Sequence, residues 1–272
     1  MAKKKIGIYG QLESTANHKV EDLYIIVDDQ SIHFSVKHLV SNEYIAFESF
    51  INNNDSNGLS PLLAYLQNNS KLMHATYNNI HFVMNTPRVL LTKSSSLKDM
   101  SIYLNELNIV HGLRQDEELI VKKVDDNKSI VYAVPDSLQT LLTRAFPTGK
   151  WEHYINALMD RQLSTGVHLY IFDQFYLMLI HLNDQIEYVR YAVESGATQN
   201  TFQVLNACKH LQIDPSQTDI YISGYSHLEH GWVESLVQYF KNAVVEQAPD
   251  TGVAGSLNKE YPNHTYSTYF IF

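Results

Sequence analysis

The sequence contains little cysteine, glycine or proline, and it has no long apolar run. The single cysteine, Cys208, among 272 residues excludes an internal disulfide framework and any cysteine-based zinc site. The longest apolar stretch, residues 175–180, is far shorter than the roughly 20 residues that a membrane-spanning helix needs. Basic residues number 20 against 29 acidic ones, which disfavours a general nucleic-acid binder, because such proteins cluster lysine and arginine.

What is present is ample material for a packed core. Hydrophobic residues make up 44% of the chain and charged residues 18%, and no linker rich in proline, glycine or serine interrupts it. Three lysines at positions 3–5 could open a signal peptide, but no apolar run follows them. We therefore expect residues 1–20 to form a solvated tail and the protein to be soluble and cytoplasmic.

One order of predicted elements occurs twice along the chain. Each half begins with a hairpin, around residues 28–31 in the first half and residues 173–174 in the second. A third strand, a helix, a further strand and a further helix then follow in both halves. The tripeptide at 169–171 repeats the Leu-Tyr-Ile of residues 23–25, and Asp173 with Gln174 echoes Asp28 with Gln30 at the turn that follows. Repetition over this length predicts a duplicated domain rather than a solenoid.

The repeat sets the expected domain boundaries. We expect a tail at 1–20, a first half at 21–164 and a second half at 165–272. The first half is expected to carry an insertion, with a helix at 94–108 and a hairpin at 119–134.

The doubled order resembles the actin-like ATPase superfold, in which two ribonuclease-H-like halves face a cleft. More closely, the chain resembles a small uncharacterised bacterial family, a domain of unknown function assigned to that fold. The second half is also similar to actin-like platform proteins of pilus assembly and cell division, which act as docking scaffolds. The resemblance implies an α/β fold with mixed sheets. The segments that carry it are Thr86-Pro87-Arg88-Val89-Leu90, Val131-Tyr132-Ala133-Val134-Pro135, Phe146-Pro147 with His153, Asp214-Pro215 and Tyr221-Ile222-Ser223-Gly224.

The resemblance also implies a nucleotide cleft, but the loops that would form it are altered. Active actin-like ATPases carry Asp-x-Gly at the first hairpin of each half, where glycine lets backbone N–H groups reach the phosphates. In this chain Gln30 stands at the glycine position of the first loop and Phe175 at that of the second. The adenosine-side loop retains one glycine, Gly224. The candidate nucleotide-cleft residues are therefore Asp28, Ser31, Asp173 and Gly224, and ordinary hairpin chemistry is the favoured interpretation of the two aspartates. No cofactor is predicted, and binding of ATP with Mg²⁺ is disfavoured.

Three further patterns are interpreted without a catalytic or metal site. The pair His227 and His230 has a spacing that could suit a metal, but we expect it to lie on the surface, and no metal site is predicted. Cys208 is expected to be a buried, inert thiol. The tyrosine-rich segment 261–272 alternates in the manner of a strand, and we expect it to add to the molecule's own sheet or to the sheet edge of a partner.

Taken together, these patterns favour a non-catalytic protein-interaction or scaffold module with a degenerate nucleotide cleft. Its partner would be another protein or a second copy of the chain. The alternative is a nucleotide-binding or kinase-like enzyme that uses Asp28, Asp173 and Gly224 in an unusual way.

Overall fold

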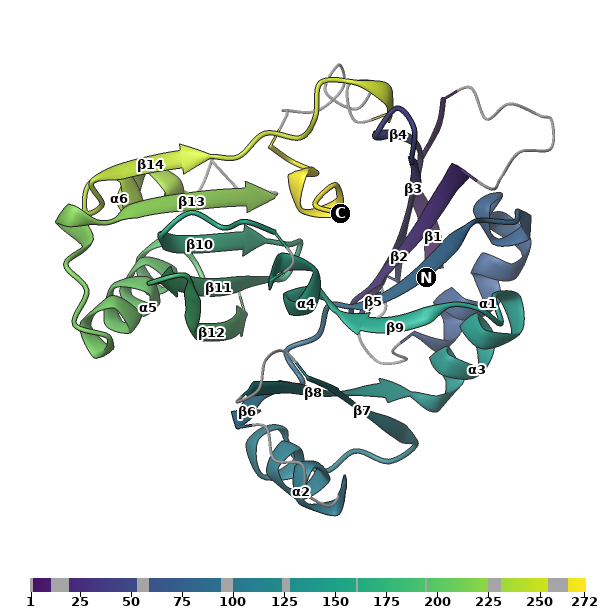
Figure 1. The fold of residues 1–272 in the computed structure, drawn as a ribbon, viewed down its shortest axis with the longest axis horizontal. Helices are drawn as coiled ribbons and strands as arrows, with labels where there is room; N and C mark the ends of the chain where they lie inside the picture. Colours follow the sequence, from purple (N-terminus) through teal and green to yellow (C-terminus); the bar gives the residue numbers. More distant parts are fainter. Residues whose placement is uncertain are drawn as a thin grey trace. The chain divides into compact units, whose positions relative to one another are not determined.

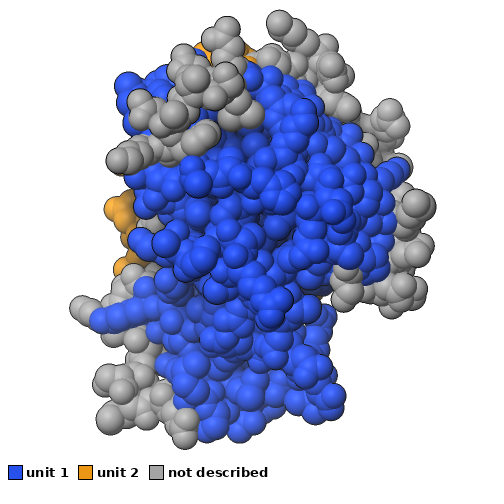
Figure 2. All heavy atoms as spheres, turned by 90° about the vertical axis from the view of Figure 1, so that its right-hand side faces the viewer, with its two compact units in different colours: residues 1–157 blue, residues 158–272 orange. Residues whose placement is uncertain are grey.

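The computed structural model describes residues 2–10, 20–52, 59–93, 100–123, 128–159, 161–193, 195–224, 231–253 and 264–272. The chain divides into two compact units, unit 1 at Met1–Ala157 and unit 2 at Leu158–Phe272 (Figures 1 and 2). Each unit is built on its own mixed sheet. No described helix has the length and apolar character needed to cross a lipid bilayer, and α5, the longest, has 14 residues.

Unit 1 contains a six-stranded sheet in the order β1-β4-β3-β2-β5-β9. Its first strands form an antiparallel meander, and the last two run parallel to β2 (Figure 1). Helix α1 packs on the strands β1 and β4 and on helix α3. The elements are β1 Ala2–Tyr9, β2 Glu21–Val27, β3 Ser31–His38, β4 Glu43–Asn52, α1 Ser60–Asn69, η2 Leu72–His74, β5 Asn79–Met84, α3 Asp136–Ala145 and β9 Lys150–His153. Helix α4 Tyr154–Met159 follows β9, and the boundary between the two units falls within it.

Unit 2 contains a five-stranded sheet in the order β12-β11-β10-β13-β14. Its core joins buried apolar side chains of the inner strands β10, β11 and β13 to apolar side chains of α5 and α6, among them Val204 and Leu236. Cys208 lies in this core, where burial raises the pKa of its thiol to about 11, so the predicted burial is confirmed. The elements are β10 Gly166–Ile171, β11 Phe175–Leu182, β12 Gln185–Val193, α5 Ala197–His210, η3 Pro215–Gln217, β13 Asp219–Gly224, α6 Trp232–Val237, β14 Asn242–Val245 and η5 Ser267–Tyr269.

The two sheets share one topology, which confirms the predicted duplication. Without β1, the order β4-β3-β2-β5-β9 matches β12-β11-β10-β13-β14, with the same parallel and antiparallel pairings. Val27 pairs with the last residue of β5, and Ile171 pairs with the last residue of β13, so Ile171 is the counterpart of Val27. The repeated Leu-Tyr-Ile tripeptide therefore misaligns the halves by two residues.

The predicted solvated tail is wrong for residues 2–9, which form strand β1. This strand pairs antiparallel with β4 and buries Ala2 and Ile6. Lys4 places its ammonium 2.5 Å from the carboxylate of Glu48, which is fully buried. Glu48 also accepts hydrogen bonds from the Tyr9 hydroxyl, from Ser70 Oγ at 2.5 Å and from the Lys71 amide at 3.1 Å. The basic residue that suggested a tail is thus an ion-pair partner inside the sheet.

An insertion of one helix and three strands interrupts unit 1 between β5 and α3. It comprises β6 Val89–Lys93, α2 Met100–His111, β7 Glu117–Lys123 and β8 Lys128–Pro135, with strand order β6-β8-β7 (Figure 1). The predicted hairpin is confirmed as the β7–β8 pair. The predicted helix is confirmed from Met100 onward, and residues 94–99 lie outside the described residues.

Two of the residues that carry the family resemblance have structural roles. Arg88 is buried, and its guanidinium donates to Glu117 at 2.8 Å, to the Gly112 carbonyl at 2.6 Å and to Asn108 at 2.8 Å. It thereby joins the start of β6 to α2 and β7. His153 is fully buried, with Nε2 3.2 Å from the Thr86 carbonyl and Nδ1 accepting from the Ile155 amide, and burial lowers its pKa to about 3.

Candidate functional site

The first hairpin uses Asp28 to close its own turn. The Asp28 amide donates to the Ser31 carbonyl, so β2 and β3 are joined by a two-residue connection. Asp28 Oδ1 accepts from the amides of Gln30 at 2.8 Å and Ser31 at 2.6 Å. Asp28 Oδ2 accepts from Ser31 Oγ at 2.5 Å. This is the local side-chain-to-backbone pattern for which aspartate is favoured in turns, so it supports the hairpin interpretation of Asp28.

Asp28 and Ser31 form a buried polar chain with a third side chain, His33. Ser31 Oγ lies 2.6 Å from His33 Nε2 and therefore bridges the carboxylate and the imidazole. All three residues are buried. Burial raises the pKa of Asp28 to about 6, although the hydrogen bonds from Ser31 and Gln30 oppose the shift. His33 could have been found from sequence only by noting that alternate residues of a strand share a face.

The second hairpin has aromatic side chains in the corresponding places. The Phe172 amide donates to the Phe175 carbonyl, as Asp28 does to Ser31, so Phe172 is the counterpart of Asp28 and Phe175 that of Ser31. The Phe172 ring stacks on Phe175 at 4.9 Å and meets Tyr269 edge-on at 6.1 Å between ring centroids. Asp173 is exposed in the turn.

This correspondence corrects the sequence alignment of the two loops. Asp173 is the counterpart of Asp29 rather than of Asp28, and Gln174 rather than Phe175 stands where Gln30 stands. The error arose because the Asp173-Gln174 pair was matched to Asp28 and Gln30 by residue type, without the strand register. Both loops still have glutamine at the position where glycine was expected.

Gly224 lies at the carboxyl end of β13 and contacts the C-terminal segment. Its φ is +95°, and a Cβ built there would lie 2.1 Å from the Ile171 carbonyl oxygen and 2.7 Å from Thr268 Cγ2. Its amide donates to Ser267 Oγ at 2.8 Å. Only glycine fits this position, because both the backbone conformation and the space exclude a side chain. Residues Tyr225 and Ser226 of the same loop, and the pair His227 and His230, lie outside the described residues.

The prediction that the C-terminal segment forms a strand is wrong for its described part. Residues 267–269 form the 3₁₀ helix η5, and every residue from 265 to 271 is buried. Burial without alternation suits a compact turn that packs on several sides, whereas a strand at a sheet edge would expose one face. The segment thus covers the carboxyl end of β13, where open α/β sheets bind ligands.

These residues do not fit the phosphate-loop chemistry that the resemblance implied. A phosphate site needs backbone N–H groups that point outward and are free to donate. The amides of Gln30 and Ser31 donate to Asp28 instead, and the Gly224 amide donates to Ser267. In unit 2, aromatic Phe172 occupies the place of the first-loop aspartate. Among the described residues, no group of three His, Cys, Asp or Glu side chains is placed to hold a metal ion.

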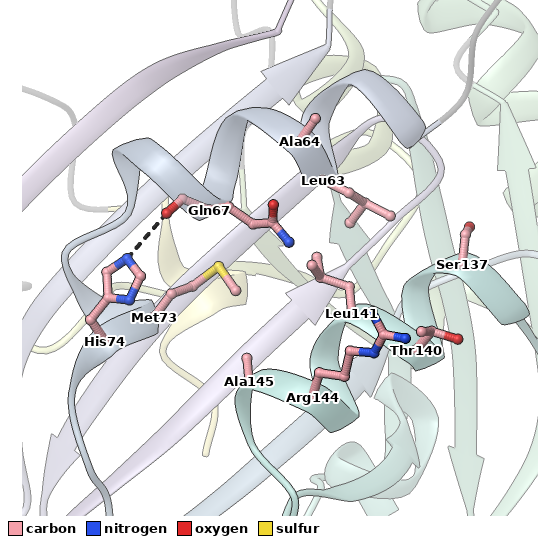
Figure 3. Close-up of a pocket in the computed structure, with 10 residues that line it drawn as sticks. All are labelled: Leu63, Ala64, Gln67, Met73, His74, Ser137, Thr140, Leu141, Arg144 and Ala145. Atoms are coloured by element: carbon pink, nitrogen blue, oxygen red, sulfur yellow. Dashed lines mark hydrogen bonds between the residues drawn. The ribbon is translucent and has the colours of Figure 1, made fainter.

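A groove in unit 1 offers a different candidate site. It lies between α1 with η2 on one side and α3 on the other, and it has a volume of about 720 Å³ (Figure 3). Its apolar lining comes from both helices and from η2, whereas its polar lining includes one arginine and one histidine. The lining residues are Leu63, Ala64, Gln67, Met73, His74, Ser137, Thr140, Leu141, Arg144 and Ala145.

The charge of the groove has one sign. Arg144 is exposed in the last turn of α3, and it makes no ion pair or hydrogen bond with any described residue. His74 lies across the groove, with Nε2 3.1 Å from the Gln67 carbonyl (Figure 3). None of the described lining residues carries a carboxylate, so the groove combines an apolar lining with a cation that a ligand could pair.

Comparisons with known proteins identify the fold. A crystal structure of a Bacteroides thetaiotaomicron protein with actin-like ATPase fold and unknown function matches with a TM-score of 0.72 at 13% identity, covering 84% of this chain and 91% of that one. A structure of the PilM–PilN type IV pilus biogenesis complex matches with a TM-score of 0.59 at 11% identity, covering 93% and 98%. No protein of curated function matches the sequence.

The resemblance seen in the sequence is confirmed, as is the predicted fold class of mixed α/β sheets in an actin-like arrangement. A family model matches residues 11–243, which is most of the chain. The chain therefore belongs to the family described as "Protein of unknown function (DUF3822)" and has the actin-like ATPase fold.

Proposed function

We propose that this protein is a non-catalytic interaction module that binds an acidic, partly apolar segment of another protein in the groove between α1 and α3. The observation that carries this proposal is the cation of Arg144, which no described residue pairs, beside the apolar lining of a groove of about 720 Å³. A peptide with one or two apolar anchors and a carboxylate would fill the floor and pair the guanidinium.

The state of two of the three nucleotide-type loops supports a non-catalytic role. The amides of Gln30 and Ser31 in the first loop, and the Gly224 amide in the adenosine-side loop, donate to side chains of the chain itself. Binding a triphosphate would require these bonds to break, and the buried acceptors would then lose their donors. Nucleotide binding therefore carries an added cost here.

A structural neighbour supports a role in protein binding. The matched PilM is described in complex with another protein, PilN. We extend that kind of role to this chain as a proposal, since the shared fold alone fixes no activity.

The groove is tested with a random peptide library displayed on phage and selected against the full chain. We expect selected peptides to share a carboxylate near apolar residues and to bind in fluorescence anisotropy. Arg144→Glu should weaken that binding at least about 10-fold, because it replaces attraction by repulsion. The matched control is Arg190→Glu, which reverses an equally exposed arginine on β12. Selection of no peptide, or peptides that bind Arg144→Glu as tightly as the parent, would overturn the proposal.

The alternative, a nucleotide-binding or kinase-like enzyme, is tested by calorimetric titration of the full chain with ATP and Mg²⁺. We expect no binding in the micromolar range and no release of phosphate. Micromolar binding with turnover that is lost in Asp28→Asn would contradict the non-catalytic role and favour the enzyme.

A further inference from the structure

The outer edge of β7 is available for another strand. β7 is a terminal strand of the insertion's sheet and pairs with β8 on one side. Within the described part of the chain, no other strand and no turn backbone bonds to its outer side. Such an edge presents a row of N–H and C=O groups that can template an added strand.

The residues of β7 are charged in a self-complementary order. The strand reads Glu-Glu-Leu-Ile-Val-Lys-Lys from 117 to 123, with acidic residues first, an apolar centre and basic residues last. Antiparallel pairing reverses the order in the partner strand. If Ile120 faces its own copy, Glu118 lies opposite Lys122 and Leu119 lies opposite Val121. Opposite charges in directly facing positions stabilise a strand pair.

The two side chains that would face each other, Glu118 and Lys122, are exposed to solvent. Glu118 and Lys122 lie on the same face of β7 because their positions differ by an even number of residues, and both are exposed. Neither makes a hydrogen bond or an ion pair with a described residue. Glu117, on the opposite face, is committed to Arg88 at 2.8 Å and stabilises the insertion itself.

Apolar side chains lie within β7 and shortly before it along the chain. Leu119, Ile120 and Val121 are only partly buried. The C-terminal part of α2 and the turn that leads to β7 expose Ile109, Val110 and Leu113 at 83%, 61% and 77% of their surfaces. This turn lies near the strand, because Arg114 within it contacts Glu117 at 3.9 Å.

We propose that two copies of this chain associate through β7, paired antiparallel about a twofold axis at Ile120. The pairing would join two three-stranded sheets into one of order β6-β8-β7-β7-β8-β6. The interface is isologous, so each favourable Glu118–Lys122 pair occurs twice. A second copy is the occupant that fits, because the charge order of β7 complements its own reverse. This self-association is separate from the α1–α3 groove and does not depend on the function proposed for it.

The proposal is tested by sedimentation equilibrium of the full chain over a wide concentration range. The parent should form a dimer. Glu118→Lys and Lys122→Glu each place like charges opposite one another twice, so each should raise the dimer dissociation constant by about 10- to 100-fold. The matched controls Glu187→Lys on β12 and Lys150→Glu on β9 reverse single exposed charges on other edge strands and should leave it unchanged.

Two combinations test the antiparallel register itself. The double variant Glu118→Lys/Lys122→Glu restores opposite charges and should dimerise like the parent. An equimolar mixture of the two single variants should form a mixed dimer, since every facing pair then has opposite signs. A monomeric parent, a dimer unaffected by either single reversal, or failure of the double variant to recover would each overturn the proposal. Circular dichroism confirms that every variant is folded.

Discussion

The amide of Gly224 donates a hydrogen bond of 2.8 Å to Ser267 Oγ, so the carboxyl end of β13 is closed by a residue 43 positions further along the chain. Thr268 packs against the same glycine, and Tyr269 meets Phe172. The C-terminal segment is therefore an integral part of the second half, and the following substitutions measure how strongly it is held.

Gly224→Ala should destabilise the protein by about 2–4 kcal/mol, because the new methyl group meets the Ile171 carbonyl at 2.1 Å and the backbone keeps a positive φ. Gly196→Ala is the matched control, since Gly196 has a similar φ of +91° and no atom within 4 Å of the added Cβ. Gly196→Ala should lower the free energy of unfolding by only about 1 kcal/mol, because backbone strain is its only cost. Urea unfolding compares the two, and equal losses would show that the space around Gly224 is not restrictive.

Ser267→Ala should cost about 1–3 kcal/mol, because it leaves the buried Gly224 amide without its acceptor. Hydrogen exchange at the Gly224 amide should become faster, in proportion to the loss of stability. The control is Ser195→Ala, which removes an exposed hydroxyl bonded to the Val193 carbonyl at 3.1 Å and should leave stability nearly unchanged. Unchanged exchange at Gly224 would contradict a role for Ser267 in closing the sheet.

Asp28→Asn should stabilise the protein above pH 6 by about 1–3 kcal/mol and have little effect below pH 4. Burial raises the pKa of Asp28 from 3.8 to about 6, so between these values the folded state binds more protons than the unfolded state. Stability is therefore lost as the pH rises through this window, and asparagine removes that loss while its carbonyl oxygen still accepts from the Gln30 and Ser31 amides.

The adjacent variant Asp29→Asn is the control for that titration, because Asp29 is exposed in the same turn. Denaturation curves at several pH values should separate the two variants only above pH 4. A pH-independent effect of Asp28→Asn would contradict the raised pKa.

Glu48→Ala should cost about 3 kcal/mol or more, because the Lys4 ammonium and the Ser70 hydroxyl lose a buried acceptor together. Glu48→Gln keeps an oxygen acceptor and should therefore destabilise the protein less than Glu48→Ala does. Hydrogen exchange should show β1 released before the remaining strands in Glu48→Ala. Uniform destabilisation of the whole sheet would mean that Glu48 does not hold β1 in particular.

Sequence patterns predicted the duplication and the hairpins because each rests on local signals. Short polar turns between apolar strands, at Asp28 and before β12, mark strand ends without any knowledge of tertiary contacts. The alignment of the two halves required the ladder register, which a three-residue echo could not supply, and so Asp173 was paired with the wrong aspartate.

The errors at the two ends of the chain have a common cause. The sequence pattern around Lys4 is typical of a solvated tail, and only its distant partner Glu48 shows otherwise. The alternating C-terminal segment is typical of a strand, and only its contacts with Gly224 and Phe172 show that it packs as a compact turn. The groove was also invisible in the sequence, because its lining comes from α1, η2 and α3, which are separated by the whole insertion. Long-range contacts determine the structure of both chain ends and of the groove, whereas local propensity determines the hairpins and the order of elements.

The bond between Gly224 and Ser267 also bears on synthesis of the protein. The residues of β13 are synthesised before Ser267. Until the ribosome adds Ser267, the Gly224 amide at the end of β13 therefore has no Ser267 hydroxyl to accept its hydrogen bond. The nascent second half would expose Phe172 and the Gly224 backbone to water until that late segment emerges. We expect chaperones to bind the nascent second half most readily during this interval.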